Sequence, residues 1–177
     1  MFNKLKRYWL KKVKYRGDHC DYARHLGVRM GRDCRILDDP DNVFGSDPYL
    51  VSLGDHVSVA AGVRFITHDG GVWVYRQREP DIDIFMPVRV GNNVFIGINV
   101  MLTPGVTIGD NVIIAAGSLV TSDMPPNSVV GGMPARVIGN VDDLYSTKAQ
   151  AFQRIRSMDN ATRRAYLVKL FDEAPST

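Results

Sequence analysis

Aliphatic residues recur at every sixth position through the middle of this chain. Seven successive positions of this series, starting at residue 84, contain only Ile, Leu and Val: Ile84, Val90, Ile96, Leu102, Ile108, Ile114 and Val120. Each position of a second series lies four residues after a position of the first, and most of these residues are valine: Val88, Val94, Val100, Val106, Val112, Ser118 and Met124. The same frame extends upstream through Leu53, Val59 and Phe65. Neither a helical period nor strand alternation produces a strict period of six, so the pattern indicates a repeat architecture.

Each hexapeptide supplies one short strand and one turn, with its aliphatic side chain pointing inward. Small residues follow the first series at Gly91, Gly97 and Gly109, where a larger side chain would crowd the turn. Three hexapeptides close a triangular coil of about eighteen residues, and successive coils stack at about 4.8 Å. The sequence therefore predicts a mainly β protein, a parallel β-helix with an aliphatic core.

Two segments leave this frame. Residues 69–83 match no repeat and carry Trp73 and Tyr75, which favours an ordered functional excursion over a disordered loop. Pro125 and Pro126 end the regular coils. We therefore expect an N-terminal helical segment at 1–29, a β-helix at 30–139 with an excursion at 69–83, and a C-terminal helical extension at 140–177.

The N-terminal segment is predicted to be a basic amphipathic helix. Its apolar face holds Phe2, Leu5, Trp9 and Val13. Cationic side chains occupy the rest of its surface: Lys4, Lys6, Arg7, Lys11, Lys12 and Lys14. Such a helix is compatible with contact to a membrane surface, but we favour packing of the apolar face on the protein body or on a neighbouring subunit.

Further helices are expected at 20–26, 142–158 and 160–173. Asn160 is the predicted N-cap of the last helix. The two C-terminal helices would cover the open end of the coil stack, which otherwise exposes unpaired backbone groups.

The composition is that of an ordinary globular protein. The net charge of +3 and the 45% hydrophobic content argue against a disordered or strongly nucleic-acid-binding chain. No apolar run approaches the ~18 residues of a membrane span, and no secretory signal is visible, so a cytoplasmic location is expected. Cys20 and Cys34 are predicted to be reduced, partly buried thiols rather than a disulfide.

The hexapeptide array, the excursion after Ile66-Thr67-His68-Asp69 and the closing segment from Gly132 to Ile138 together resemble a known family. They are similar to the left-handed parallel β-helix acyltransferases, most closely to the sugar and capsular-polysaccharide O-acetyltransferases that include maltose and galactoside acetyltransferases. The resemblance covers about residues 30–139 and includes the stretch from Phe44 to Leu50. It implies a left-handed coil, acetyl-CoA as donor, a sugar hydroxyl as acceptor in surface polysaccharide synthesis, and no metal. It also implies a homotrimer with active sites between subunits.

His68 matches the histidine that the family uses as general base. An alcohol that attacks a thioester must lose its proton, and the pKa of histidine suits that task near neutral pH. With no activated Ser or Cys nucleophile evident nearby, direct transfer is expected. Asp69 either orients the imidazole or points elsewhere. The alternative for His68 is a hydrogen-bonded histidine at the entrance to the excursion.

The resemblance also implies how the acetyl donor binds. A backbone N–H near Gly97 and Ile98 would stabilise the oxyanion. Contacts to coenzyme A would come from Phe95, Ala116, Thr121 and Arg136. Phe95 stands where many relatives have tryptophan, and Ser122 stands where many have lysine, so one cationic contact to the cofactor is missing.

Acceptor binding is the least specific expectation. Asp47 and Tyr49 are candidates to bond sugar hydroxyls, and Trp73 and Tyr75 are candidates to stack on a sugar ring. Each of these four side chains also has an ordinary structural explanation.

Three other functions are alternatives for a β-helix of this kind. A zinc-dependent carbonic anhydrase of the β-helix type needs three converging histidines, and only His56 and His68 lie within the coils. A non-catalytic β-helix scaffold predicts that His68 tolerates substitution. A drug-inactivating acetyltransferase shares the fold but usually closes with a different sequence from Arg136-Val137-Ile138, which favours a cellular sugar as acceptor.

Overall fold

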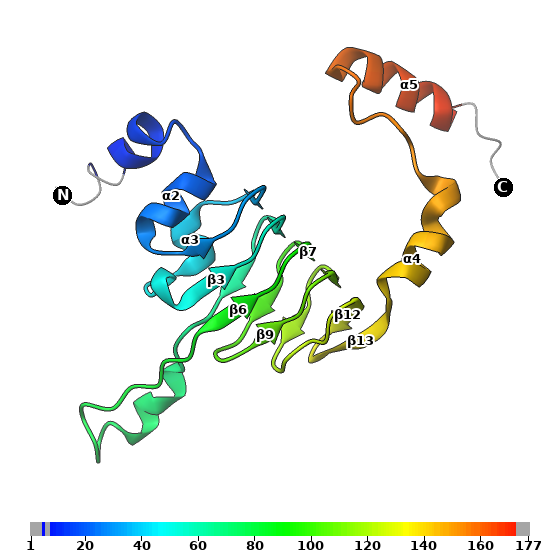
Figure 1. The fold of residues 1–177 in the computed structure, drawn as a ribbon. Coiled ribbons are helices and arrows are strands. Elements are labelled where there is room, and N and C mark those ends of the chain that lie inside the picture. The colour runs from blue at the N-terminus through cyan, green and yellow to red at the C-terminus, as the bar shows by residue number, and fades with distance from the viewer. Residues whose placement is uncertain (1–4, 6–7, 173–177) are drawn as a thin grey trace. The chain divides into compact units, whose positions relative to one another are not determined.

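Three β-sheets surround a narrow core in the structure, a computed structural model that describes residue 5 and residues 8–172 (Figure 1). The four-stranded sheet contains β1 (Arg29–Met30), β3 (Val51–Leu53), β6 (Val88–Val90) and β9 (Thr107–Ile108). The six-stranded sheet contains β2 (Arg35–Ile36), β4 (Ser58–Val59), β7 (Val94–Ile96), β10 (Val112–Ile114), β12 (Ser128–Gly132) and β13 (Ala135–Asn140). The three-stranded sheet contains β5 (Arg64–Phe65), β8 (Met101–Leu102) and β11 (Leu119–Val120).

Successive strands enter different sheets, so the chain winds around a common axis. Apart from β13, strands within a sheet pair in parallel with strands of the neighbouring coil: Val94 pairs with Val112, and Met101 with Leu119. The spacing of 18 residues is the coil of three hexapeptides predicted from the sequence. Three such parallel sheets, with helices before and after them, are typical of a left-handed β-helix, as predicted.

The predicted aliphatic ladder forms the core. Ile96, Leu102 and Ile114 have no exposed surface, and each buried aliphatic side chain of this size stabilises the fold by about 1.5–3 kcal/mol. The expectation for Ile84 is wrong, because this side chain is 43% exposed. Its carbonyl accepts a hydrogen bond from the Asp69 N–H, which keeps residue 84 in the excursion, and the stack resumes only at Val88.

The excursion between β5 and β6 begins and ends with paired backbone. His68 and Phe85 form an antiparallel bridge at its base. Beyond that bridge lies the 3₁₀-helix η3 (Gly70–Tyr75), in which Val72 is buried. In Figure 1 this green segment projects away from the coils.

Helices precede the first coil, as expected. They are the π-helix η1 (Leu10–Lys14) and α2 (His19–Leu26), whereas α3 (Pro40–Phe44) and the 3₁₀-helix η2 (Pro48–Leu50) lie between β2 and β3. Leu5, Trp9 and Val13 are 52–64% exposed, so packing of this face on the chain's own body is wrong; Phe2 lies outside the described residues. Cys20 and Cys34 are free and partly buried, which confirms the prediction for the thiols.

After the last coil, β13 turns back and pairs antiparallel with β12. It leads into α4 (Val141–Lys148), η4 (Ala149–Ala151) and α5 (Asn160–Asp172). The N-cap expected at Asn160 is instead Asp159, whose carboxylate accepts the N–H groups of Ala161 and Thr162. The chain divides into two compact units, 1–144 and 145–177. Coverage of the coil end by the helices and the three segment limits stay predictions.

None of the helices among residues 8–172 combines the length and the hydropathy that crossing a bilayer requires.

Candidate active site

The side chains of His68 and Asp47 meet where the chain leaves β5 for the excursion. His68 Nδ1 lies 3.3 Å from Asp47 Oδ2, and the two side chains are 49% and 12% exposed. Because Nδ1 faces the carboxylate, Nε2 is the ring nitrogen left to meet a substrate. An imidazole oriented in this way is suited to accept a proton from an attacking hydroxyl.

Packing of α3 explains why Asp47 reaches His68. Phe44, the last residue of α3, is fully buried and stacks on Phe65 with 5.1 Å between ring centroids. Phe65 belongs to β5 and precedes His68 by three residues. The chain then turns at Gly45, whose φ of +63° is readily adopted by glycine, and carries Asp47 to the imidazole.

Two hydroxyl groups hold the Asp47 carboxylate. The Ser46 hydroxyl donates to Oδ2 over 2.6 Å, and the Tyr49 hydroxyl donates to Oδ1 over 2.9 Å. The hydrogen bond from Ser46, followed by those from Tyr49 and His68, lowers the pKa of Asp47 despite its burial. The same contact with Asp47 raises the pKa of Tyr49. Asp47 is therefore an ionised acceptor at neutral pH.

The Asp69 carboxylate caps the helix that follows it, which favours the alternative in which it points elsewhere than at the imidazole. Its Oδ1 accepts the Gly71 N–H over 2.8 Å and caps η3. Asp47, expected only as an acceptor ligand, is the carboxylate that contacts the histidine. Nothing in the linear sequence signals this contact, because it depends on how α3 packs.

An open pocket of about 410 Å³ lies beside this pair. Its walls come from the stack and from the excursion: Ser46, Asp47, His68, Asp69, Gly70, Trp73, Arg76, Asp83 and Phe85. The sequence interpretation missed Ser46, Arg76, Asp83 and Phe85, and the only signal for the last three was their place in or beside the excursion.

The excursion brings one of its two predicted aromatic side chains to the pocket. Trp73 lines it and remains 73% exposed, whereas Tyr75 is 58% exposed and does not line it. Arg76 is ion-paired with Asp83 and lies 6.0 Å from the centre of the Trp73 ring. The pocket therefore offers an exposed aromatic face near carboxylates, a combination suited to a sugar ring and its hydroxyls.

The residues expected to bind the acetyl donor are spread over the stack, and Phe95, Gly97 and Ile98 lie in or just after β7. Gly97 packs directly on the next coil, where a Cβ would lie 2.6 Å from the Ala116 nitrogen. The Gly97 N–H donates to the Ile114 carbonyl over 2.9 Å, which leaves the Ile98 N–H as the candidate of this pair. Phe95 points outward from β7 and is 43% exposed.

His68 and the candidate oxyanion pair, Gly97 and Ile98, occupy different edges of the triangular stack. His68 follows β5, where the three-stranded sheet turns into the four-stranded sheet, and Thr121 lies on the same edge after β11. Gly97 and Ile98 lie between β7 and β8, where the six-stranded sheet turns into the three-stranded sheet. Arg136 is exposed on β13. A single chain therefore does not bring the predicted base and the predicted oxyanion donor together.

His56 occupies the third edge, between β3 and β4, with its Nδ1 2.8 Å from Asn93 Oδ1. Among the described residues no three or more His, Cys, Asp or Glu side chains gather as metal ligands do.

Comparison with known proteins agrees with this architecture. A family model described as bacterial transferase hexapeptide (six repeats) matches residues 87–122. Protein CapG of Staphylococcus aureus is 45% identical over 170 residues, which are 96% of this chain and 98% of CapG. Galactoside O-acetyltransferase of Escherichia coli (strain K12) is 44% identical over 97 residues, 55% of this chain and 47% of that protein.

Solved structures show the same relationship. A galactoside acetyltransferase in complex with coenzyme A is 37% identical with a TM-score of 0.57, covering 68% of this chain and 58% of that one. A hexapeptide-repeat acetyltransferase from Vibrio cholerae O1 biovar eltor, complexed with acetyl-CoA, is 34% identical with a TM-score of 0.54, covering 65% and 61%. This chain thus spans nearly all of CapG and about half to three fifths of the other three. The resemblance inferred from the repeats is confirmed: the chain belongs to the hexapeptide-repeat acetyltransferases, close to CapG and the galactoside O-acetyltransferases.

Proposed function

We propose that this protein transfers the acetyl group of acetyl-CoA directly to a sugar hydroxyl, with His68 as general base and Asp47 as its positioning residue. The observation that carries the proposal is the His68–Asp47 contact of 3.3 Å at an open pocket walled by Trp73. The donor is supported by the relatives whose structures contain coenzyme A or acetyl-CoA. The sugar acceptor is supported by the likeness to galactoside O-acetyltransferase.

His68 Nε2 takes the hydroxyl proton while the sugar oxygen attacks the thioester carbonyl. The new C–O bond gives a tetrahedral intermediate whose oxyanion is met by a backbone N–H, for which Ile98 is our candidate. The C–S bond then breaks, and the proton on Nε2 passes to the departing sulfur. Of the residues that line the pocket, Ser46 carries the only hydroxyl, and it is donated to Asp47, which favours direct transfer over an acetyl-enzyme.

We further propose a trimer with one active site at each subunit boundary. The support is the separation of His68 from Gly97 and Ile98 on different edges of one chain. Closed threefold packing places one edge of a subunit against a different edge of its neighbour, which completes the site. Phe95, Ala116, Thr121 and Arg136 are the candidate contacts to coenzyme A, and Ser122 leaves one cationic contact unmade.

The proposed acceptor belongs to surface polysaccharide synthesis in the cytoplasm, where acetyl-CoA is available. Trp73 is positioned to stack on the ring, while Tyr75 requires movement of the excursion to join it. Asp47 and Tyr49 already bond each other, so they would contact the acceptor as a pair.

The test is acetyl-CoA consumption against a panel of free, nucleotide-linked and polymeric sugars and of acetyl-accepting drugs. His68→Ala should lower turnover by about 10²–10⁴-fold. His56→Asn is the matched control. His56 lies on another edge of the stack and has a left-handed backbone conformation, which asparagine also adopts at Asn93, where φ is +54°. Thiol release with drugs alone would favour the drug-inactivating enzyme. No release with any acceptor would favour the scaffold, and a trapped acetyl-enzyme would rule out direct transfer.

A further inference from the structure

Positive charge in this chain is concentrated at its N-terminus. Residues 1–16 contain seven Lys and Arg residues and no Asp or Glu. Because the whole chain carries 22 basic and 19 acidic residues, the remaining residues carry 15 and 19, a net charge of −4. A short cationic segment is thus attached to an acidic body.

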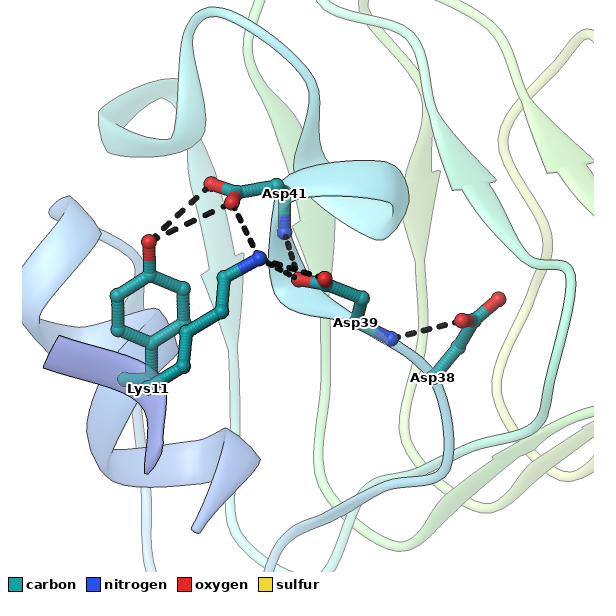
Figure 2. Close-up of polar contacts among 5 residues, drawn as sticks. Lys11, Asp38, Asp39 and Asp41 are labelled. Atoms are coloured by element: carbon teal, nitrogen blue, oxygen red, sulfur yellow. Dashed lines mark hydrogen bonds and ion pairs between the residues drawn. The ribbon is translucent and has the colours of Figure 1, made fainter. Parts of the chain in front are cut away.

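One lysine fastens this segment to the body. Lys11 Nζ lies 2.5 Å from Asp39 Oδ2 and 2.6 Å from Asp41 Oδ2, at the start of α3. The Tyr22 hydroxyl donates to Asp41, and the Lys11 ammonium lies 5.4 Å from the Tyr22 ring centre. Figure 2 shows the ammonium between the two carboxylates. The side of the segment that carries Lys11 therefore faces the body.

The opposite side carries apolar and aromatic side chains that are open to solvent. Leu5 and Tyr8 are each 64% exposed, Trp9 is 52% exposed and Val13 is 54% exposed. Their spacing of three and four residues places them on one helical face, which we call the exposed face. Lys14, the residue after Val13, is also exposed and adds a cation to this segment.

We propose that the exposed face (Leu5, Tyr8, Trp9 and Val13) is a docking surface for an anionic lipid bilayer and enters the headgroup region. Trp and Tyr beside Leu and Val suit the boundary between headgroups and acyl chains, and flanking lysines are attracted to anionic lipid. A nucleic acid would leave the aliphatic side chains exposed to water. Two copies of the segment would repel each other because they carry like charges. The Lys11 contacts hold the segment so that its apolar side is presented outward.

Vesicle binding tests the surface with a matched control in the same chain. The full-length protein is sedimented with vesicles of phosphatidylcholine alone or of equal parts phosphatidylcholine and phosphatidylglycerol. Val13→Ser/Lys14→Glu is compared with Val168→Ser/Lys169→Glu, which alters the same exposed Val-Lys pair on α5, where Val168 is 51% exposed. We expect binding to anionic vesicles that weakens at high salt, about tenfold weaker binding for the first variant, and little change for the second.

Fluorescence supplies a second readout. The chain has two tryptophans, so Trp73→Phe leaves Trp9 as the only one, and its emission should shift to the blue with anionic vesicles. Equal loss of binding in both double variants, or equal binding to neutral vesicles, would overturn the proposal. An unshifted Trp9 emission would do so as well. A change in molecular mass of the Val13→Ser/Lys14→Glu variant, with vesicle binding intact, would assign the exposed face to a second copy instead.

Discussion

Replacing Asp47 by Asn removes the negative charge beside His68 and keeps the size of the side chain. The two groups lie 3.3 Å apart, with exposed fractions of 49% for His68 and 12% for Asp47. At that distance the interaction of two unit charges is about 1.3 kcal/mol in water and about 5 kcal/mol at an effective dielectric constant of 20. Because the imidazole is half-exposed, we expect the loss of interaction energy to lie near the lower of these two values, at about 2 kcal/mol. This corresponds to about a 30-fold fall in kcat.

Steady-state kinetics with acetyl-CoA and the acceptor found in the panel measures this loss. Because Asp47 acts on the imidazolium that forms during the reaction, kcat should fall while the KM for acetyl-CoA is unchanged. The same substitution in a His68→Ala background should have no further effect on kcat, since the group that it positions is gone.

Asp83→Asn is the matched control for this experiment. Asp83 lines the same pocket but is ion-paired with Arg76 rather than facing His68. Its replacement should change the KM for the acceptor more than kcat. Equal losses of kcat in the two variants, or additive losses of Asp47→Asn and His68→Ala, would refute the assignment of Asp47 as the residue that positions the base.

Three further predictions concern stability. Ile96→Ala, at a fully buried core position, should lower the free energy of unfolding by about 2–5 kcal/mol in denaturant titrations. Ile98→Ala, at a 54% exposed position, should change the free energy of unfolding by less than about 0.5 kcal/mol. Gly97→Ala should lower the melting temperature because its Cβ would meet the next coil at 2.6 Å; Gly70→Ala, with open space around it, should not. Because its pKa is lowered in the folded state, ionised Asp47 stabilises the fold above about pH 4, and this contribution is lost as pH falls through the lowered pKa. Asp47→Asn should therefore make the free energy of unfolding depend less on pH in this range.

The coil could be predicted from the sequence because its determinants are local. Each inward side chain sits at a fixed position in a six-residue unit, so Ile96, Leu102 and Ile114 were identified by counting, and all three are fully buried. The six-residue count wrongly predicts a buried Ile84. Backbone pairing across the base of the excursion holds this residue outside the repeat. The N-cap at Asp159 was missed by one residue, which is within the usual uncertainty of helix ends.

The candidate pocket could be predicted only in part. The sequence proposes His68 because it borders the excursion and matches a family motif, and Trp73 because the excursion carries it, and both line the pocket. The contact of His68 with Asp47 depends on Phe44 stacking on Phe65, a tertiary contact that no spacing rule contains. The separation of His68 from Gly97 on different edges becomes visible only once the strands are assigned to sheets.

One five-residue helix links the two surfaces for which functions are proposed. At its start, Asp39 and Asp41 hold Lys11 and thereby the N-terminal segment. Just beyond its end, Asp47 contacts His68. So short a helix is not stable by itself, so its position depends on the buried anchor at Phe44 rather than on helix propensity. The packing of that side chain therefore determines both how the cationic segment is presented and where the carboxylate meets the base.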